Sequence, residues 1–373
     1  DVIDIASDGT CRANITNNLS NRNLVINGAM QVAQRSAAAV AVSDGNNEGY
    51  QTIDRMHFSY GNSAAGAANI SQDTDAPTTL GFTKSHKTDV TTINSTSSGN
   101  GVVGLKYSIE GQDLRSSGWN HLSASSYLTL SFYFKTTKTG NSKLPIMFRT
   151  LHGTAYYYVQ NVTVTDPTNW NRYTVRLPGN SNLTINDVNT AGMAIFFSYQ
   201  TGSDKDTSSE GAWGTTNAYS TSESTNYFDS TSNDMFITGI QLEVDHTGSG
   251  KPTDYEHRSY QDEYLRCSRY FYFTNSQHFF TARGNNTDTI IGFVETQVPL
   301  RTTPSITLTG SLRHWGIDSN SSSSTQPTIP SFREGQKGVR VNQTGHSGVN
   351  DDCVCTVQCD GSDGQGLSFS AEL

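Results

Sequence analysis

The stretch LTLSFYFK, residues 128–135, decides the fold class of the chain. Its apolar side chains occupy every second position, at Leu128, Leu130, Phe132 and Phe134. A period of two indicates a β-strand with one buried face, because successive side chains point to opposite sides. The same alternation occurs in VGLKYSIE (103–110), YTVRL (173–177) and FITGIQLEV (236–244). These segments therefore predict half-buried strands.

Another stretch, GMAIFFSY (192–199), is apolar at nearly every position, which is typical of a central strand covered on both faces. Loops rich in Ser, Thr, Asn and Gly separate the strands, and the longest covers residues 201–226. Charged residues make up 16% of the chain, against about 25% in an average soluble protein, and this composition favours strands and turns over helices. Many short strands joined by polar turns indicate a β-sandwich.

Residues 255–269 break this pattern. Tyr260, Tyr264 and Cys267 follow the helical period, and no Gly or Pro interrupts them. Asp254 precedes the run and is placed to act as the N-cap. We expect one short helix here.

Strand patterns resume after this helix, at residues 289–300 and 305–310. Further on, CVCTVQC (353–359) and LSFSAEL (367–373) are joined by a loop rich in Gly and Asp. Two strands joined in this way predict a hairpin that closes a second β unit.

Composition excludes several classes of function. The formal net charge of the 373-residue chain is −9, so we expect no nucleic-acid binding, because there is no basic excess to neutralise phosphates. We expect no membrane insertion, since no apolar run approaches the roughly 20 residues that span a bilayer. The five cysteines do not form a disulfide framework, and we expect them to be reduced.

Two kinds of chemical site, a zinc site and a pair of catalytic carboxylates, have candidate residues in this sequence. Cys353, Cys355 and Cys359, with His346 upstream, do not have a usual zinc-ligand spacing, and alternation places the three cysteines on one buried strand face. Glycoside hydrolysis needs two carboxylates about 5–10 Å apart, which sequence alone cannot place. We therefore predict no enzyme activity, no metal site and no cofactor.

Exposed aromatic side chains in polar loops are a stronger functional signal, because a flat ring binds the C–H face of a sugar. The candidates for glycan binding are Trp119, Trp213, Tyr156, Tyr157 and Tyr158. The alternative for each is packing between neighbouring chains or domains.

Several motifs together resemble a widespread bacteriophage and prophage tail-fibre type. They are NRNLVINGAMQVAQRS, YQTIDRMHF, FITGIQLEV and TDYEHRSYQDEYLRCSRYFYF, with SAEL at residues 370–373. The matching residues are Asn23 to Gly28, Gln34, Arg35, Tyr50, Asp54, Arg55, Gln241 to Val244, Tyr255, Glu256, Arg258, Glu263, Cys267, Arg269 and Tyr270. Two departures, Met56 for a common Trp and Tyr264 for a Leu, conserve apolar character.

The resemblance implies a virion structural protein, located on the tail or particle surface, that binds host-surface polysaccharide. It implies a homotrimer in contact with other virion tail or portal-vertex proteins. The central jelly roll also resembles carbohydrate-binding modules that hold a structural calcium. Here Gln31 stands near the place of one acidic ligand and only Asp245 matches another, so a calcium site is doubtful. The alternatives are a polysaccharide depolymerase and a purely architectural head-fibre or collar protein.

We therefore predict an all-β protein with a central jelly-roll β-sandwich, a short connecting helix and a small C-terminal β-sandwich. The expected parts are an extended N-terminal attachment segment (1–20), the jelly roll (21–248), a linker with the helix (249–272) and the C-terminal sandwich (273–373). We interpret the charged and aromatic run at 255–273 as an interdomain joint, made of Tyr255, Arg258, Tyr260, Glu263, Tyr264, Arg266, Cys267, Arg269 and Tyr270. Arg258, Glu263 and Arg269 would form ion pairs, and Tyr260, Tyr264, Cys267 and Tyr270 would form the apolar side.

Overall fold

The computed structural model describes residues 4–5, 11–12, 21–61, 65–95, 99–274, 279–315, 320–333, 335–360 and 365–373. Most of the expected N-terminal attachment segment lies outside these residues. Two short strands fall within it, β1 (Asp4–Ile5) and β2 (Cys11–Arg12), and they pair with each other. The domain limits drawn from the sequence stay predictions.

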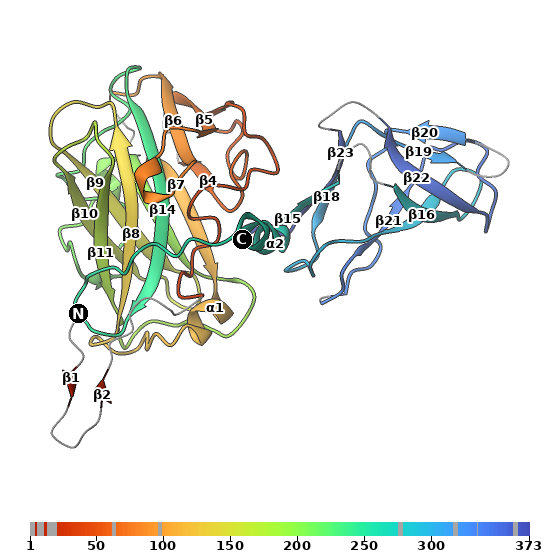
Figure 1. Ribbon diagram of the computed structural model, residues 1–373. Coiled ribbons are helices and arrows are strands. Elements are labelled where there is room, and N and C mark those ends of the chain that lie inside the picture. Colours follow the sequence, from red (N-terminus) through yellow and green to blue (C-terminus); the bar gives the residue numbers. More distant parts are fainter. Residues whose placement is uncertain are drawn as a thin grey trace.

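Two six-stranded antiparallel sheets form the larger unit, the jelly roll (Figure 1). The first sheet contains, in order, β13 (Trp213–Gly214), β10 (Tyr157–Val164), β9 (Ser142–Thr150), β12 (Ala191–Thr201), β7 (Val102–Glu110) and β4 (His57–Gly61). The second contains β11 (Asn171–Pro178), β8 (Tyr127–Thr136), β14 (Asp234–Asp245), β6 (Ser85–Thr92), β5 (Ala67–Asp73) and β3 (Val40–Ser43). This architecture confirms the predicted all-β fold.

One hydrophobic core lies between the two sheets. The alternating residues of β8 supply its centre, and Phe132 contacts Phe197 of the opposite sheet with ring centroids 5.1 Å apart. The strand β12 lies between β9 and β7, as its continuous apolar pattern predicts. Its outer face is covered in part by the loop after it, where Tyr219 packs edge-on against Phe196 at 5.1 Å.

Short helical segments complete the jelly roll and lead out of it. They are η1 (Thr78–Leu80), α1 (Gly111–Ser116) and η2 (Ser203–Lys205) in the jelly roll, followed by α2 (Tyr260–Ser268). The expected N-cap of α2 is wrong: Ser259, and not Asp254, accepts a hydrogen bond from the N–H of Asp262 at 3.1 Å. The chain before Ser259 is instead held by side chains of the jelly roll.

The smaller unit contains two antiparallel sheets around a second core. One sheet has the order β15 (Phe271–Phe273), β23 (Gly366–Ser370) and β18 (Ser305–Thr309). The other has the order β20 (Asn320–Ser323), β19 (Ser311–Trp315), β22 (Val354–Asp360), β16 (Phe279–Gly284), β17 (Ile290–Val294) and β21 (Val339–Gln343). Side chains of both sheets share one cluster, so the unit is a small sandwich.

The predicted hairpin at the end of the chain is wrong. The strands β22 and β23 follow each other in sequence but belong to different sheets, because β22 pairs with β16 and β19 while β23 pairs with β15 and β18. Cys355 and Cys359 face the core as expected, whereas Cys353 lies before β22 and is exposed. All four cysteines whose side chains the structure describes are free.

The helix α2 lies between the two units, and the end of the described chain lies beside it (Figure 1). The first residues of the smaller unit leave α2 directly into β15. Among the helices of the described ranges, none has the length and apolarity needed to cross a membrane.

Candidate functional site

A groove of about 690 Å³ opens along one edge of the jelly roll. It lies where β10 of the first sheet runs beside β11, the edge strand of the second sheet. The two strands are not hydrogen-bonded to each other, and their side chains line the space between them. The lining residues are Tyr127, Tyr158, Gln160, Asn161, Val162, Thr163, Arg172, Tyr173, Thr174, Val175, Arg176 and Pro178.

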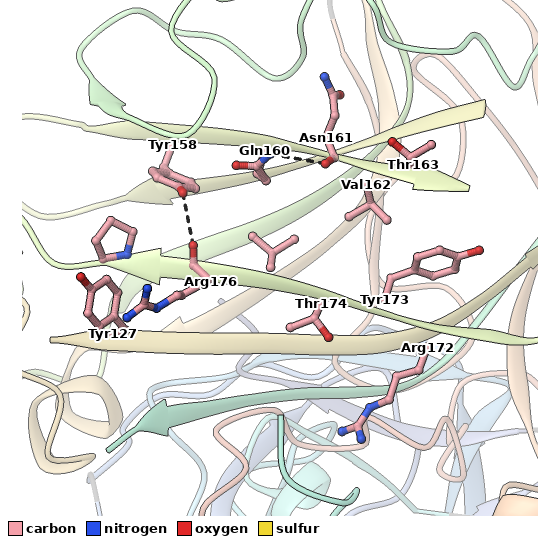
Figure 2. A pocket seen from close by; sticks show the side chains of 12 residues that line it. Tyr127, Tyr158, Gln160, Asn161, Val162, Thr163, Arg172, Tyr173, Thr174 and Arg176 are labelled. Atoms are coloured by element: carbon pink, nitrogen blue, oxygen red, sulfur yellow. Dashed lines mark hydrogen bonds between the residues drawn. The ribbon is translucent and has the colours of Figure 1, made fainter. Parts of the chain in front are cut away.

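Aromatic rings stand at both ends of this groove. Tyr158 bridges the two strands, because its hydroxyl donates a hydrogen bond of 3.2 Å to the carbonyl oxygen of Arg176 (Figure 2). The guanidinium of Arg176 stacks on the ring of Tyr127, with 3.4 Å between its carbon and the ring centroid. Tyr173 lies at the other end, and Figure 2 shows Arg172 turned away from β10.

Amide and hydroxyl groups line the remaining wall. The amides of Gln160 and Asn161 are fixed by Glu210, whose carboxylate accepts hydrogen bonds of 2.7 Å from Gln160 Nε2 and 3.2 Å from Asn161 Nδ2. The carbonyl oxygen of the Asn161 side chain is buried and has no hydrogen-bond partner.

The hydroxyls of Tyr158 and Tyr173 stay protonated at neutral pH. Burial raises the pKa of Tyr158, and the charge of Glu210 raises it further. Burial and the charge of Asp166 raise the pKa of Tyr173. Protonated phenols and fixed amides can donate to and accept from sugar hydroxyls, and the rings offer apolar faces.

Two of the aromatic residues singled out in the sequence meet at this groove. Tyr158 lines it, and Trp213 lies next to Tyr158 with ring centroids 5.5 Å apart. The indole N–H of Trp213 donates a hydrogen bond of 2.7 Å to the carbonyl oxygen of Pro178, so this side chain ties β13 to β11. The expectation that Tyr158 is exposed in a loop is corrected, because it lies on β10 and is buried.

The other three candidates lie elsewhere. Trp119 is only 4% exposed, and its indole N–H donates to the carbonyl oxygen of Ser126, so its expected exposure is wrong. Tyr157 is buried on the outer face of the first sheet. Tyr156 is half-buried against the main core. These rings are covered by neighbouring strands and loops. The local sequence does not reveal this burial, because it depends on which segments pack together.

The joint residues form a hydrogen-bonded network between α2 and the beginning of the jelly roll. Arg258 donates to the carbonyl oxygens of Asn23 and Val25, and pairs with Glu263 at 3.2 Å. Glu263 in turn accepts a hydrogen bond of 2.6 Å from the backbone N–H of Asn27. Burial would lower the pKa of Arg258, but the charges of Glu263 and Glu256 raise it.

Backbone geometry and close packing explain why Asn27 and Gly28 occur next to this network. Asn27 has a left-handed backbone, with φ of 61°, and its side chain bonds both the N–H and the carbonyl of Val32. A Cβ on Gly28 would lie 2.1 Å from the carbonyl oxygen of Ile240. The hydroxyl of Tyr255 would be 3.0 Å from the same Cβ, so only glycine fits.

The motif QLEV at 241–244 holds the linker. The side-chain oxygen of Gln241 accepts a hydrogen bond of 2.8 Å from the N–H of Glu256. Glu243 accepts bonds of 2.8 and 2.6 Å from the N–H and hydroxyl of Thr253. These contacts keep the residues before Ser259 extended and explain why the helix begins later than expected.

The end of α2 is tied to the jelly roll by Glu110. Arg269 donates two hydrogen bonds of 3.0 Å to this carboxylate, and the hydroxyl of Tyr270 donates a third of 2.6 Å. Cys267, a residue of α2 itself, is fully buried on the inner side of the helix. Arg266 contacts the side chain of Asn21.

Tyr260 and Tyr264 were expected on the apolar side of the joint, and the structure corrects this. Tyr260 is 57% exposed and stacks on Tyr264, which is half-buried, with ring centroids 6.1 Å apart. Tyr260 therefore lies on the solvent side of α2, because the helix begins at this residue and turns Glu263 and Cys267 inward.

The contacts that attach the smaller unit involve residues outside the predicted joint. Glu372 binds Arg55 at 2.6 Å and Arg35 at 3.2 Å. Burial would lower the pKa of Arg55, but the charge of Glu372 raises it. Arg301 donates to the carbonyl oxygens of Ala371 and Asn189, and so bridges the two units. In the sequence, this cluster is marked only by motifs: Gln34-Arg35, Asp54-Arg55 and SAEL at residues 370–373.

No metal centre is evident in the described ranges, where no three His, Cys, Asp or Glu side chains gather as a ligand set. Asp245, the one residue that matched a calcium ligand, accepts hydrogen bonds from the N–H groups of Thr247, Ser249 and Gly250. Burial would raise its pKa, but these bonds lower it. Its carboxylate therefore stabilises the turn at 245–250.

Comparison with protein families gives no matching family model, and no curated protein matches. Among solved structures, an enzymatically active domain of tailspike protein 4 from bacteriophage CBA120 is 13% identical, with a TM-score of 0.32, over 60% of this chain and 22% of that one. A family 11 carbohydrate-binding module from Clostridium thermocellum is 14% identical, with a TM-score of 0.27, over 56% and 97%. A xylan-binding domain from Paenibacillus barcinonensis is 9% identical, with a TM-score of 0.27, over 59% and 99%.

Proposed function

We propose that the protein binds a host-surface glycan in the groove between β10 and β11 and does not cleave it. The observation that carries this proposal is the lining of the groove, in which tyrosine rings and fixed amides face a space of about 690 Å³. Binding sites for sugars need apolar faces for the ring and a few placed polar groups for the hydroxyls. The groove supplies both.

The lining also favours binding over hydrolysis. Glycoside hydrolysis uses a pair of carboxylates on either side of the bond that breaks. The residues that line the groove include no Asp or Glu, and the nearby Glu210 is engaged by Gln160 and Asn161. A depolymerase remains the alternative that the assay below must separate.

We further propose that the protein is part of a virion, as a tail fibre or related appendage, and that it is a homotrimer. The motifs that resemble tail fibres support this assignment, because their side chains interlock at one place, around α2. Sedimentation of the purified chain at high concentration tests the trimer, and a monomer there would contradict it. Imaging of labelled protein on intact particles tests the location and separates a fibre from a collar protein.

The groove is tested by filling it. Thr174 is an exposed residue of β11 that lines the groove, and Thr174→Trp places a large ring there. Thr91→Trp is the matched control, since Thr91 is also an exposed strand residue but lies on β6, away from the groove. Both variants would be titrated against a panel of bacterial lipopolysaccharides and capsules.

We expect at least one polysaccharide to bind the wild type and the Thr91 variant equally, and the Thr174 variant at least tenfold more weakly. Equal binding by all three proteins would remove the groove from the proposal. Steady release of oligosaccharides during incubation would replace binding with depolymerase activity. Failure of the wild type to bind any host cell would favour the architectural role.

A further inference from the structure

The outer face of the first jelly-roll sheet carries three cations close together in a chain of negative net charge. Lys106 lies on β7, Arg149 lies on β9, and Lys205 ends η2, in the segment after β12 that covers part of this face. In the part of the chain that the structure describes, no carboxylate lies within ion-pair distance of any of them. Other lysines of the jelly roll do pair with carboxylates, namely Lys87, Lys135, Lys138 and Lys143.

The sheet register places the first two cations around a small residue. Ala194 of β12 lies opposite Arg149 on one side and Ser108 on the other, and Lys106 follows two residues from Ser108 on the same face. The methyl group of Ala194 leaves room between the two long side chains. Neighbouring strands are about 4.8 Å apart, so both cations can reach one small anion above β12.

Aromatic rings and hydroxyls surround this place. The ring of Tyr157 lies 5.4 Å from the guanidinium carbon of Arg149. Tyr219 lies beside Lys205, whose ammonium is 6.0 Å from the ring centroid, and it shares a hydrogen bond with Arg149. The Nε atom of Arg149 is buried and has no hydrogen-bond partner.

The surroundings of Lys106 act against its charged form. Burial lowers the pKa of Lys106, and the charge of Arg149 lowers it further. Burial also lowers the pKa of the neighbouring His57 to about 3, and Lys106 contributes to this shift. Half-buried like charges repel each other, and an anion bound between them would remove that repulsion.

We propose that Lys106 and Arg149 form a binding site for the carboxylate group of an acidic sugar on the outer face of this sheet. A guanidinium binds a carboxylate through two parallel hydrogen bonds, and an ammonium adds a point charge. The rings of Tyr157 and Tyr219 flank the place where the rest of the sugar would lie. This site is on a different surface from the groove and does not depend on the function proposed for it.

The test uses trigalacturonic acid as the probe, neutral galactotriose as its uncharged counterpart and inorganic phosphate as a competitor, all by calorimetry at low salt. We expect the wild type to bind the acidic trisaccharide at least tenfold more tightly than the neutral one. Lys106→Gln and Arg149→Gln should each weaken this binding at least tenfold. Arg149→Lys, which keeps the charge but loses the fork, should give an intermediate loss.

The control variant is Lys138→Gln, which removes a cation that already pairs with Asp229 and should bind like the wild type. Thr174→Trp should also leave this binding unchanged, because it blocks only the groove. Circular dichroism checks that each variant is folded.

Three results would overturn the proposal. Unchanged binding by the folded Lys106 and Arg149 variants would remove the site. Loss of binding in the Thr174 variant would place the acidic sugar in the groove instead. Displacement of the acidic sugar by phosphate at the same concentration would show a general anion site and not one for the carboxylate of a sugar.

Discussion

The ion pair between Glu372 and Arg55 is the contact through which we expect the two units to depend on each other. The side chain of Arg55 is 1% exposed, and it binds Glu372 at 2.6 Å, the carbonyl oxygen of Ser108 at 2.7 Å, and the ring of Tyr270 at 3.6 Å. Replacing Glu372 with Gln would leave this buried guanidinium without a neutralising charge. Breaking one side of a buried pair costs about 3–5 kcal/mol.

We expect Glu372→Gln to lower the free energy of unfolding by about 3 kcal/mol, at the lower end of that range, because the Gln oxygen can still accept one hydrogen bond. Urea unfolding followed by tryptophan fluorescence measures the change. The matched control is Asp352→Asn, which breaks the pair with Arg283 on the surface, where the side chains are 77% and 51% exposed. An exposed pair contributes about 1 kcal/mol or less.

A double-mutant cycle with Arg55→Met separates the pair from its surroundings. We expect a coupling energy of about 2 kcal/mol or more between Arg55 and Glu372, since each single change leaves the other charge buried. If Glu372→Gln costs no more than Asp352→Asn, the two units are not joined through this carboxylate and the reasoning is refuted.

Three further predictions concern pH and sterics. Burial and the charge of His314 lower the pKa of His346 to about 4. The stability that this neutral histidine pair provides should therefore be present above about pH 6.5 and decline as the pH falls towards 4. His346→Gln should flatten that part of the pH profile in urea unfolding. The lowered pKa of Asp245 means that its stabilisation is present above the ordinary carboxyl range and is lost as the pH falls through its folded value, so Asp245→Asn should unfold with less dependence on acid below pH 5. Gly28→Ala should cost about 1–3 kcal/mol in thermal or urea unfolding, because its Cβ would collide with the carbonyl of Ile240, and an unchanged midpoint would refute that steric reading.

The strands were predictable because their cause is local. Alternating apolar residues at 128–135 or 173–177 bury one face whichever strand lies beside them, so the period of two identifies them directly. The same local reasoning failed at 353–373, where two strands joined by a turn-rich loop entered different sheets. Strand order depends on long-range pairing, which alternation does not encode.

The candidate site depends on that strand order. The groove exists because β10, which only the short strand β13 separates from the edge of the first sheet, lies beside β11, the edge strand of the second sheet. Tyr158 and Trp213 are aromatic candidates from the sequence, but Trp119 also stands next to a glycine in a polar stretch and is buried. Glu372 lies 317 residues from Arg55, so only the co-occurrence of their motifs connects them before the structure is known.

The most direct test of the central claim is where a bound glycan lies on the protein. Methyl and aromatic NMR spectra would be recorded with and without the polysaccharide that the binding panel selects. We predict that the perturbed signals cluster on Tyr127, Tyr158, Val162 and Tyr173, along the groove between β10 and β11. Perturbations confined to other surfaces, with these four residues unchanged at saturation, would contradict the account.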